Sequence, residues 1–311
     1  MGKIVVPLFF KGDLKEIIDK TKLAKKEGAK VIEIRGDSFL QICEKDLEKL
    51  KEISKKLKIP FILTLREKKE GGVFQIPFEK KQNLIKKAIL LNFDFLDIEL
   101  EFLEKLKKNA KELKGNSKTK IILSYHNFKD KVNLKKLKEI KKRMEALKPD
   151  ILKFAFLPKT KRENQIILKF LKQLKKERKK SILISMGELG KRSRLETIED
   201  NFFSYFALKD KTGPGQLTIE QLKAWKEILK LRKKLDKITF RLIEILSKRK
   251  EIVLELKKLK KKAQIQIEDK EREKKLMEMV QKLAKEKSLD LIFVKKIFKF
   301  LIENAKKIQK D

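Results

Sequence analysis

The stretch KIILSYHNFKDKVNLKKLKEIKKRMEALKPDILKFAF (120–156) decides the fold. It begins with an apolar run rich in isoleucine and leucine. A segment rich in lysine and glutamate follows, in which apolar residues recur at helical spacing, and a second apolar run ends the stretch. Strand, helix and strand in this order are typical of a βαβ unit, whose two strands are parallel.

The same alternation extends over the first 230 residues or so. Eight apolar runs predict eight strands: IVVPLFF (4–10), VIEIRGD (31–37), FILTLR (61–66), FLDIEL (95–100), KIILSYH (120–126), ILKFAF (151–156), SILISM (181–186) and SYFAL (204–208). Eight βα repeats predict an α/β fold, a closed (β/α)8 TIM barrel with its helices outside. A doubly wound open sheet is the alternative, but it would normally carry a glycine-rich phosphate turn after an early strand, and the sequence has none.

The rest of the chain predicts a different architecture. No glycine or proline follows Gly215, so an all-α three-helix domain is expected, with breaks near QIQIED (264–269) and KSLD (287–290). We expect a barrel domain at 1–228 and a helical domain at 229–311. No glycine-rich linker separates them, so the last barrel helix should run directly into the tail.

The first tail helix carries apolar residues at helical spacing over a long stretch. Because three helices cannot cover that face, a homodimer is predicted.

Composition excludes several classes of protein. No apolar run approaches the roughly 20 residues of a membrane span. The N-terminus lacks the features of a signal peptide, and the single cysteine, Cys43, excludes an internal disulfide, so we expect a cytoplasmic location and no membrane partner. The net charge is +38, but lysines are spread over every helical segment and mixed with 45 acidic residues, which disfavours nucleic-acid binding. Such a surface can still attract anionic substrates.

Arginine is scarce, because only 11 of the 83 basic residues are Arg. It should therefore remain where a planar, bidentate fork for carboxylates is needed. In a TIM barrel the working residues lie at the C-terminal ends of the strands. Those ends and the loops after them carry polar or sulfur-containing side chains at Glu33, Arg35, Arg66, Glu70, His126, Lys153, Met186, Arg194 and Gln216.

Two of these residues suggest the chemistry. Strand alternation places Ile151, Lys153 and Ala155 on one face, which we expect to be the interior of the barrel. Burial should then lower the pKa of Lys153, so that its neutral amine can attack a carbonyl. His126, the only histidine, is suited to remove the proton next to the resulting iminium ion and to pass it to a leaving hydroxyl, which is a dehydration. The structural alternatives are a lysine that reaches solvent at a strand edge and a hydrogen-bonded histidine without a catalytic role.

Six motifs carry a resemblance. EIRGD (33–37), TLREKKEGG (64–72), SYHNF (124–128), KFAFLP (153–158), SMGELGKRSR (185–194) and TGPGQ (212–216) resemble, in order, those of type I 3-dehydroquinate dehydratases. The resemblance implies that Lys153 forms a Schiff base, that His126 is the acid and base, and that Glu70 orients His126. It also implies substrate contacts at Glu33, Arg35, Arg66, Met186, Arg194, Thr212 and Gln216, with Arg194 as the carboxylate clamp. A class I aldolase also has a Schiff-base lysine on strand six, but the Arg-x-x-x-Glu-Gly-Gly run and His126 favour the dehydratase.

The tail carries a second resemblance. LRKKLDKI (231–238), LSKRKEIVLELKKLK (246–260), IEDKEREKKL (267–276) and FLIENAKKIQ (300–309) resemble all-helical chorismate mutases. It implies that Arg249, together with Arg232 of a second copy, binds the two carboxylates. Lys260 and Gln309 would then approach the ether oxygen. The resemblance further implies that Asp269 and Glu273 hold the ring hydroxyl and that Arg272 lines the pocket. Such a site works by folding its substrate and stabilising charge, without an acid or a base.

The two resemblances together predict a bifunctional enzyme of the shikimate and aromatic amino-acid route. The barrel would dehydrate 3-dehydroquinate to 3-dehydroshikimate, and the tail would convert chorismate to prephenate. Neither reaction calls for a cofactor, and a single His with a single Cys offers no metal-ligand cluster. Two alternatives stay open: a monofunctional dehydratase with a structural dimerisation tail, and a basic binding protein on a degenerate barrel.

Overall fold

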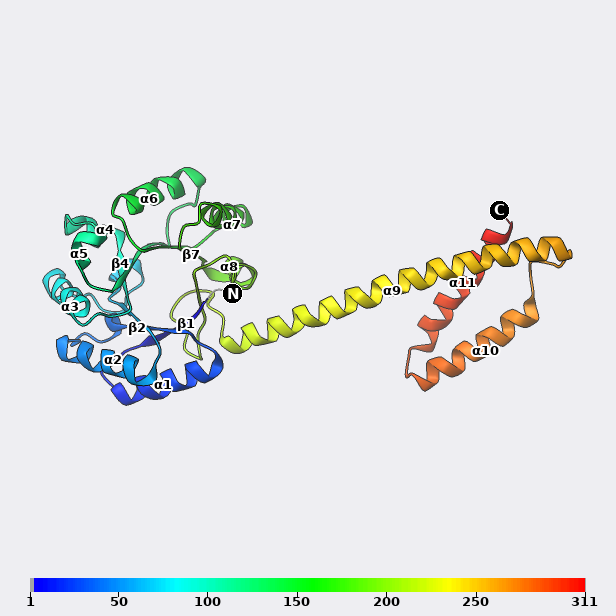
Figure 1. Cartoon of the computed structure of the whole chain (residues 1–311), viewed down its shortest axis with the longest axis horizontal. Helices are drawn as coiled ribbons and strands as arrows, with labels where there is room; N and C mark the ends of the chain where they lie inside the picture. The colour runs from blue at the N-terminus through cyan, green and yellow to red at the C-terminus, as the bar shows by residue number, and fades with distance from the viewer. Residues whose placement is uncertain (1–2, 311) are drawn as a thin grey trace. The chain divides into compact units, whose positions relative to one another are not determined.

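A computed structural model of the chain describes residues 3–310. Its N-terminal part is an eight-stranded, all-parallel sheet that curls into a nearly closed barrel (Figure 1). The strands are β1 (Lys3–Phe9), β2 (Val31–Arg35), β3 (Phe61–Thr64), β4 (Phe95–Glu99), β5 (Lys120–Asn127), β6 (Ile151–Phe156), β7 (Ser181–Ser185) and β8 (Phe203–Tyr205). The predicted barrel is confirmed, and each strand lies within a few residues of the predicted run.

The seam of the barrel lies between β7 and β8. The order of paired strands runs from β7 through β6, β5, β4, β3, β2 and β1 to β8. Two hydrogen bonds connect β7, at one end of this sheet, to the segment just before β8, at the other end. The backbone N–H of Phe202 donates to the carbonyl of Ser181 at 2.8 Å, and the N–H of Leu183 donates to Oδ1 of Asn201 at 2.6 Å. The sheet is therefore closed by a loop and a side chain where the short strand β8 offers too few backbone partners.

Helices alternate with the strands and cover the outside of the barrel (Figure 1). They are α1 (Leu14–Glu27), α2 (Glu44–Leu57), α3 (Phe78–Leu90), α4 (Leu100–Lys105), α5 (Ala110–Lys114), α6 (Leu134–Ala146), α7 (Lys161–Lys176) and α8 (Gly187–Glu196), with short 3-10 turns η1 (Gly36–Ser38) and η2 (Lys68–Glu70). Side-chain caps set several of their starts. Asp13 accepts from two backbone N–H groups at the start of α1, and Asn133 and Thr160 cap α6 and α7 in the same way.

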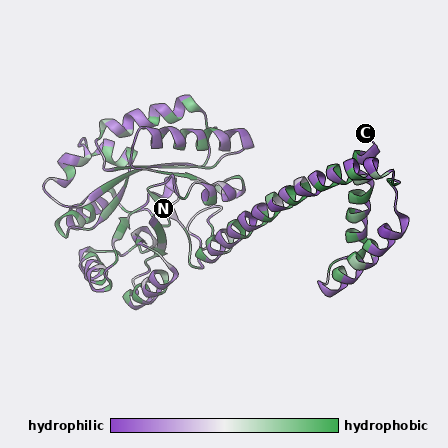
Figure 2. Ribbon diagram, turned by 45° about the vertical axis from the view of Figure 1, so that its right-hand side comes forward, coloured by the Kyte–Doolittle hydropathy of each residue, from purple (hydrophilic) through white to green (hydrophobic). Residues whose placement is uncertain are grey.

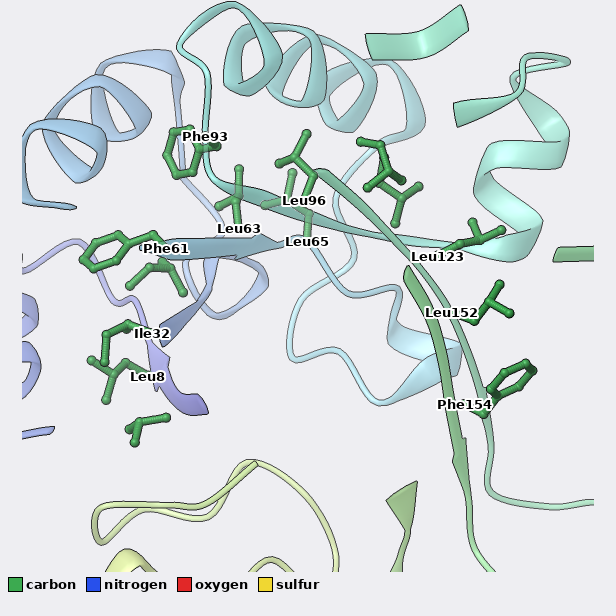
Figure 3. Packing of buried hydrophobic residues seen from close by; sticks show 14 of the residues in the cluster. Leu8, Ile32, Phe61, Leu63, Leu65, Phe93, Leu96, Leu123, Leu152 and Phe154 are labelled. Carbon is green, nitrogen blue, oxygen red and sulfur yellow. The ribbon is translucent and has the colours of Figure 1, made fainter. Parts of the chain in front are cut away.

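Strand alternation divides the core in two. Outward-facing residues such as Ile32, Phe61 and Phe154 belong to a large cluster that includes the inner faces of the helices (Figure 3). Inside the barrel, a smaller apolar cluster contains one residue from each of β1 to β7, Ile62 and Ile151 among them, and two residues from β8. On β2 to β6, the next inward positions toward the C-terminal ends are polar and buried: Glu33, Thr64, Asp97, Ser124 and Lys153. The barrel interior thus has an apolar base under a layer of charge.

The chain divides into two compact units, one up to Lys226 and one from Glu227 onward. Helix α9 (Ile219–Ala263) crosses this boundary without a break, as the missing linker predicts. It is followed by α10 (Lys270–Glu286) and α11 (Leu291–Lys310), so the two predicted breaks are confirmed.

Helix α9 exposes much apolar surface in a single copy of the chain. Leu235, Ile238, Leu242 and Ile245 are 54–65 % exposed, and Figure 2 shows hydrophobic segments alternating with hydrophilic ones along the helix. Among the described residues, no helix is long and apolar enough to cross a membrane.

Candidate active site

A cavity of about 330 Å³ opens at the C-terminal ends of the barrel strands. All ten barrel residues that the sequence singles out line it: Glu33, Arg35, Arg66, Glu70, His126, Lys153, Met186, Arg194, Thr212 and Gln216. They come from six strands and the loops after them, so the barrel alone brings them together. Between residues 3 and 310, no group of three His, Cys, Asp or Glu side chains is placed to hold a metal ion.

Lys153 projects from β6 into the cavity and is 3 % exposed. Its Nζ lies 2.6 Å from Oδ2 of Asp97 and 3.3 Å from Oε1 of Glu33, and 4.5 Å from the centre of the Tyr205 ring. Burial acts to lower the pKa of this ammonium, but Asp97 and Glu33 outweigh burial and raise the pKa above its ordinary value. The expectation of a lowered pKa was therefore wrong, because two carboxylates from other strands surround the amine.

Asp97 is the main residue of this site that sequence reasoning missed. It lies on β4, its side chain is fully buried, and besides Lys153 it accepts from Arg66 at 2.8 Å and from Ser124 at 2.6 Å. Burial would raise the pKa of this carboxyl, but Arg66 and Lys153 hold it far below its usual range. The signal in the sequence was the alternation Phe95, Asp97, Glu99, which places two carboxylates on the inward face of a strand.

His126 lies at the end of β5, and Glu70 holds it in place. Nδ1 of His126 lies 2.9 Å from Oε2 of Glu70, and the backbone N–H of His126 donates to the same oxygen at 3.1 Å. Burial raises the pKa of the Glu70 carboxyl to about 8. Burial and the nearby Arg66 and Lys153 lower the pKa of His126 well below its usual value, so the imidazole is neutral at pH 7. The Glu70 contact occupies Nδ1 and leaves Nε2 for a substrate.

The turn that carries Glu70 depends on the glycines after it. Glu70 ends the 3-10 turn η2, and Gly71 follows with a φ of +88°. A Cβ on Gly72 would lie 2.1 Å from the carbonyl oxygen of Arg66. The Glu-Gly-Gly run therefore lets the backbone fold back on itself and point the carboxyl at His126.

The three cavity arginines differ in their partners. Arg35 makes a two-pronged ion pair with Asp37, with both contacts at 2.8 Å, and Arg66 is paired with Asp97. Arg194 donates to the backbone carbonyls of Ser185 at 3.1 Å and Pro214 at 2.8 Å, and it forms no ion pair within residues 3–310. Burial lowers the pKa of Arg194 to about 10, so it is still a cation at neutral pH. Its charge is the one among these three that a ligand carboxylate can neutralise.

The remaining predicted residues form the rim. Met186 is buried just before α8, and Gln216 follows the Gly213-Pro214-Gly215 turn after β8. Oε1 of Gln216 accepts from the backbone N–H of Thr212 at 2.7 Å and from its hydroxyl at 3.1 Å. Gly215 has a φ of +65°, and a Cβ there would lie 2.2 Å from the carbonyl oxygen of Gly187. The turn thus lies close against the first residue of α8.

The tail residues are placed differently. Lys260 donates to the carbonyl of Ile267 at 2.8 Å, and Asp269 caps α10 by accepting from the backbone N–H of Arg272 at 2.9 Å. Glu273 is ion-paired with Lys306 at 2.9 Å. Gln309 donates to the carbonyl of Ala305, and its own Oε1 is buried without a hydrogen-bond partner among the described residues.

The groove that the tail forms in a single copy of the chain does not gather these residues. Arg232 and Arg249 lie on α9. A groove of about 550 Å³ between α10 and α11 is lined by Glu273 and by none of the other six predicted mutase residues, as far as residues 3–310 show.

Comparison with known proteins decides the family of the barrel. Residues 4–236 match the type I 3-dehydroquinase family. The chain belongs to this family. Its dehydroquinase domain is 37 % identical over 201 residues to the 3-dehydroquinate dehydratase of Methanocaldococcus jannaschii, a match that covers 63 % of this chain and 86 % of that protein. The corresponding protein of Pyrococcus abyssi is 30 % identical over 226 residues, which cover 73 % and 98 %.

Solved structures agree with the family and the fold. A type I 3-dehydroquinate dehydratase from Clostridium difficile, with covalently modified comenic acid, matches with a TM-score of 0.64 and 25 % identity, over 73 % of this chain and 92 % of that one. The enzyme from Aquifex aeolicus matches with a TM-score of 0.59 and 27 % identity, over 75 % and 98 %.

The tail has a match of its own. Residues 231–310 match the chorismate mutase type II family. The chain therefore joins a dehydroquinase domain to a chorismate mutase domain, and the two matches together support a bifunctional enzyme of the shikimate route, as the sequence predicts.

Proposed function

We propose that residues 1–228 dehydrate 3-dehydroquinate through a Schiff base on Lys153, and that residues 229–311 convert chorismate to prephenate in a cytoplasmic homodimer. One observation carries the first part. Three groups face the same cavity: the buried Lys153, the neutral His126 oriented by Glu70, and the cation Arg194. Among the described residues, only backbone carbonyls accept hydrogen bonds from Arg194.

Schiff-base formation begins at the Lys153 ammonium. The amine must lose a proton before it attacks the substrate ketone. Glu33, 3.3 Å away, is suited to take that proton, because Asp97 is also held by Arg66. Attack gives a carbinolamine, and Glu33 returns its proton to the carbinolamine hydroxyl, which leaves as water and gives an iminium ion. The iminium is again a cation, so Asp97 faces positive charge before and after the step and stabilises both forms.

His126 then carries the dehydration. Its neutral imidazole removes a proton from the carbon next to the iminium, which leaves an enamine. The protonated imidazole gives that proton to the hydroxyl on the following carbon, which departs as water as the new double bond forms. Hydrolysis of the product iminium frees Lys153. Glu70 keeps the ring in place through both transfers because two contacts to one carboxyl oxygen fix the residue.

Arg194 selects the substrate. A ring carboxylate that meets this guanidinium would replace two neutral carbonyl partners with a charged one. The hydroxyls of the ring would find Arg35, Arg66 and Gln216 on other sides of the cavity. The pocket therefore suits a hydroxylated ring that carries one carboxylate.

The mutase proposal requires a second copy of the chain. The exposed apolar residues on α9 are the surface that a second copy would cover, and the scattered tail residues are the parts of a site that is incomplete in one copy. In the dimer, Arg232 of one copy would complete the pocket that contains Arg249, Lys260 and Arg272 of the other. A rearrangement without proton transfer needs only this set of cations and hydrogen-bond donors.

Trapping tests the Schiff base. The full-length protein is treated with 3-dehydroquinate and sodium borohydride and then analysed by intact-mass and peptide-mass spectrometry. We expect one reduced adduct on Lys153, and none in Lys153→Met. Lys120 is exposed on the neighbouring strand β5, and Lys120→Met is the matched control, which should label like the wild type. An unlabelled wild type that still turns over the substrate would contradict the proposal.

A further inference from the structure

A buried lysine outside the barrel mouth is the feature that the mechanism above does not use. Lys81 lies on α3 and is 1 % exposed, and it does not line the cavity. We propose that Lys81 and Glu99 are positioning residues of the dehydratase, which hold Arg66 against Asp97 and so fix the charge layer around Lys153. This inference rests on the proposed role of the cavity.

Lys81 has two carboxylate partners. Its Nζ lies 2.7 Å from Oε2 of Glu99 and 2.8 Å from Oε1 of Glu67, and it lies 4.5 Å from the centre of the Phe102 ring. An ammonium this deeply buried is costly unless it is paired, so these contacts leave it few other positions. Glu67 is partly exposed and also accepts from Gln75, whereas Glu99 is almost fully buried. Glu99 is therefore the partner that depends on Lys81.

The other oxygen of Glu99 faces Arg66, which lines the cavity. Oε1 accepts from the backbone N–H of Glu67 at 2.8 Å and lies 3.4 Å from Nη1 of Arg66. The lysine on one side and this backbone donor on the other fix the rotation of the carboxylate. Glu99 therefore presents one defined oxygen to Arg66.

Arg66 links this pair to the reacting residues. Its guanidinium donates to Asp97 and Ser124 at 2.8 and 2.7 Å, and it lies 3.8 Å from Glu70, which orients His126. Charges thus alternate in order along Lys81, Glu99, Arg66, Asp97 and Lys153. A displacement at one end of such a buried series should reach the other, because each charge has few alternative partners.

The loss of Lys81 would leave Glu99 with Arg66 as its remaining cation. Glu99 would then draw Arg66 away from Asp97 or take up a proton. In both cases Arg66 changes its position at the cavity wall, where it is proposed to contact substrate. Misplacement by a fraction of an ångström is enough to slow a reaction that depends on alignment.

The alternative is that Lys81 only neutralises buried carboxylates. Two single variants and their combination separate the two roles. Lys81→Met removes the cation, Glu99→Gln removes the charge that meets Arg66, and the double variant restores electrical balance at nearly unchanged volume. Lys86→Met is the matched control, since Lys86 is an exposed lysine on the same helix. For each full-length protein, kcat and KM for 3-dehydroquinate, thermal midpoint and borohydride trapping of Lys153 are measured.

We expect Lys81→Met to lower kcat/KM by roughly tenfold or more, a loss typical of a misplaced contact residue. In the double variant the thermal midpoint should recover toward that of the wild type, while kcat/KM stays low because Arg66 no longer has a charged partner at position 99. Lys86→Met should match the wild type in both measurements.

Two results would overturn the inference: wild-type kcat/KM in folded Lys81→Met, or full recovery of kcat/KM together with stability in the double variant. If Lys81→Met does not fold, Glu99→Gln and the double variant still decide between the roles. Failure of the proposed function gives a different result, because the wild type itself would then show no adduct on Lys153.

Discussion

The barrel and the helical tail differ in how separation along the chain relates to closeness in space. In the barrel, ten predicted residues separated by up to 183 positions along the chain, from Glu33 to Gln216, line one cavity in one copy of the protein. In the tail, seven predicted residues within 78 positions, from Arg232 to Gln309, lie on and between three helices, and of these seven only Glu273 lines the groove between α10 and α11. A closed parallel sheet brings all its strand ends to one side, whereas a long helix points its side chains outward along its length. Closeness in sequence therefore says little about which site a single chain can complete.

The largest expected effect is the loss of one activity without the other when a tail residue is changed. Arg249→Ala should lower chorismate mutase activity by about 10²–10³-fold, because the variant loses a charge that stabilises the transition state. Its dehydratase kcat/KM should stay unchanged. Both activities are measured on the same full-length preparation, with Lys250→Ala as the control at a neighbouring exposed position. Loss of both activities would mean that the tail supports the barrel instead of carrying a site of its own.

The next effect tests whether the tail needs a partner. Leu242 is 54 % exposed on the apolar side of α9. Leu242→Glu should weaken the dimer by roughly thirtyfold or more, since it puts a charge in an apolar interface. Mutase activity should then depend on protein concentration, while dehydratase activity should not. Analytical ultracentrifugation and both assays over a dilution series measure this.

Lys237→Glu is the matched control, because helical spacing places Lys237 on the opposite side of α9. A Leu242→Glu protein with an unchanged mass and full mutase activity would contradict the proposed dimer surface.

A smaller effect is expected at the barrel rim. Arg194→Lys should raise KM for 3-dehydroquinate by roughly tenfold, with a smaller change in kcat, because an ammonium cannot reproduce the planar fork of a guanidinium. Arg192→Lys serves as the control, since Arg192 is exposed and pairs with Glu196. Steady-state kinetics at constant ionic strength measure both variants. Equal KM values would remove Arg194 from the substrate site.

The smallest effect concerns pH. Catalysis requires neutral His126, whose pKa burial lowers well below the ordinary value of 6.5. Dehydratase kcat/KM should therefore hold as the pH falls through 6.5 and should decline only at lower pH. Mutase activity depends on no such base, so its acid limb should differ. A dehydratase profile with its midpoint at or above 6.5 would contradict the environment described for His126.

The pKa of Glu70 gives the sign of a stability effect. Folding raises the pKa of its carboxyl to about 8, so the stabilisation is present below the ordinary value near 4.5 and is lost as the pH rises toward about 8. Compared with Glu70→Gln, which cannot ionise, the wild type should lose stability over this range. Urea denaturation of both proteins at several pH values measures the difference.

Some of the site could be predicted without coordinates. The period of two in ILKFAF placed Lys153 on the inner face of the barrel, and the Arg-x-x-x-Glu-Gly-Gly run together with His126 favoured a dehydratase over an aldolase. The roles implied by resemblance are still predictions, but the residues are where the motifs place them. Alternation and glycine turns are local properties, so a sequence carries them directly.

Other parts of the site depend on strands that meet in space. The pKa of Lys153 could not be predicted, because its partners Asp97 and Glu33 lie 56 and 120 positions away in the chain. Nothing in the sequence distinguishes Lys81 from the many other helical lysines, and its burial follows from Glu99 and Phe102 packing over it.

Local sequence is enough to predict the order of strands and helices, the inward position of Lys153 and the breaks in the tail, since periodicity and helix-breaking residues act over a few neighbours. Tertiary structure alone decided which charges meet. The electrostatics of Lys153, His126 and Arg66 arise from groups that the closed barrel brings within a few ångströms, and the energy of a charge depends on distance and burial, not on position in the chain.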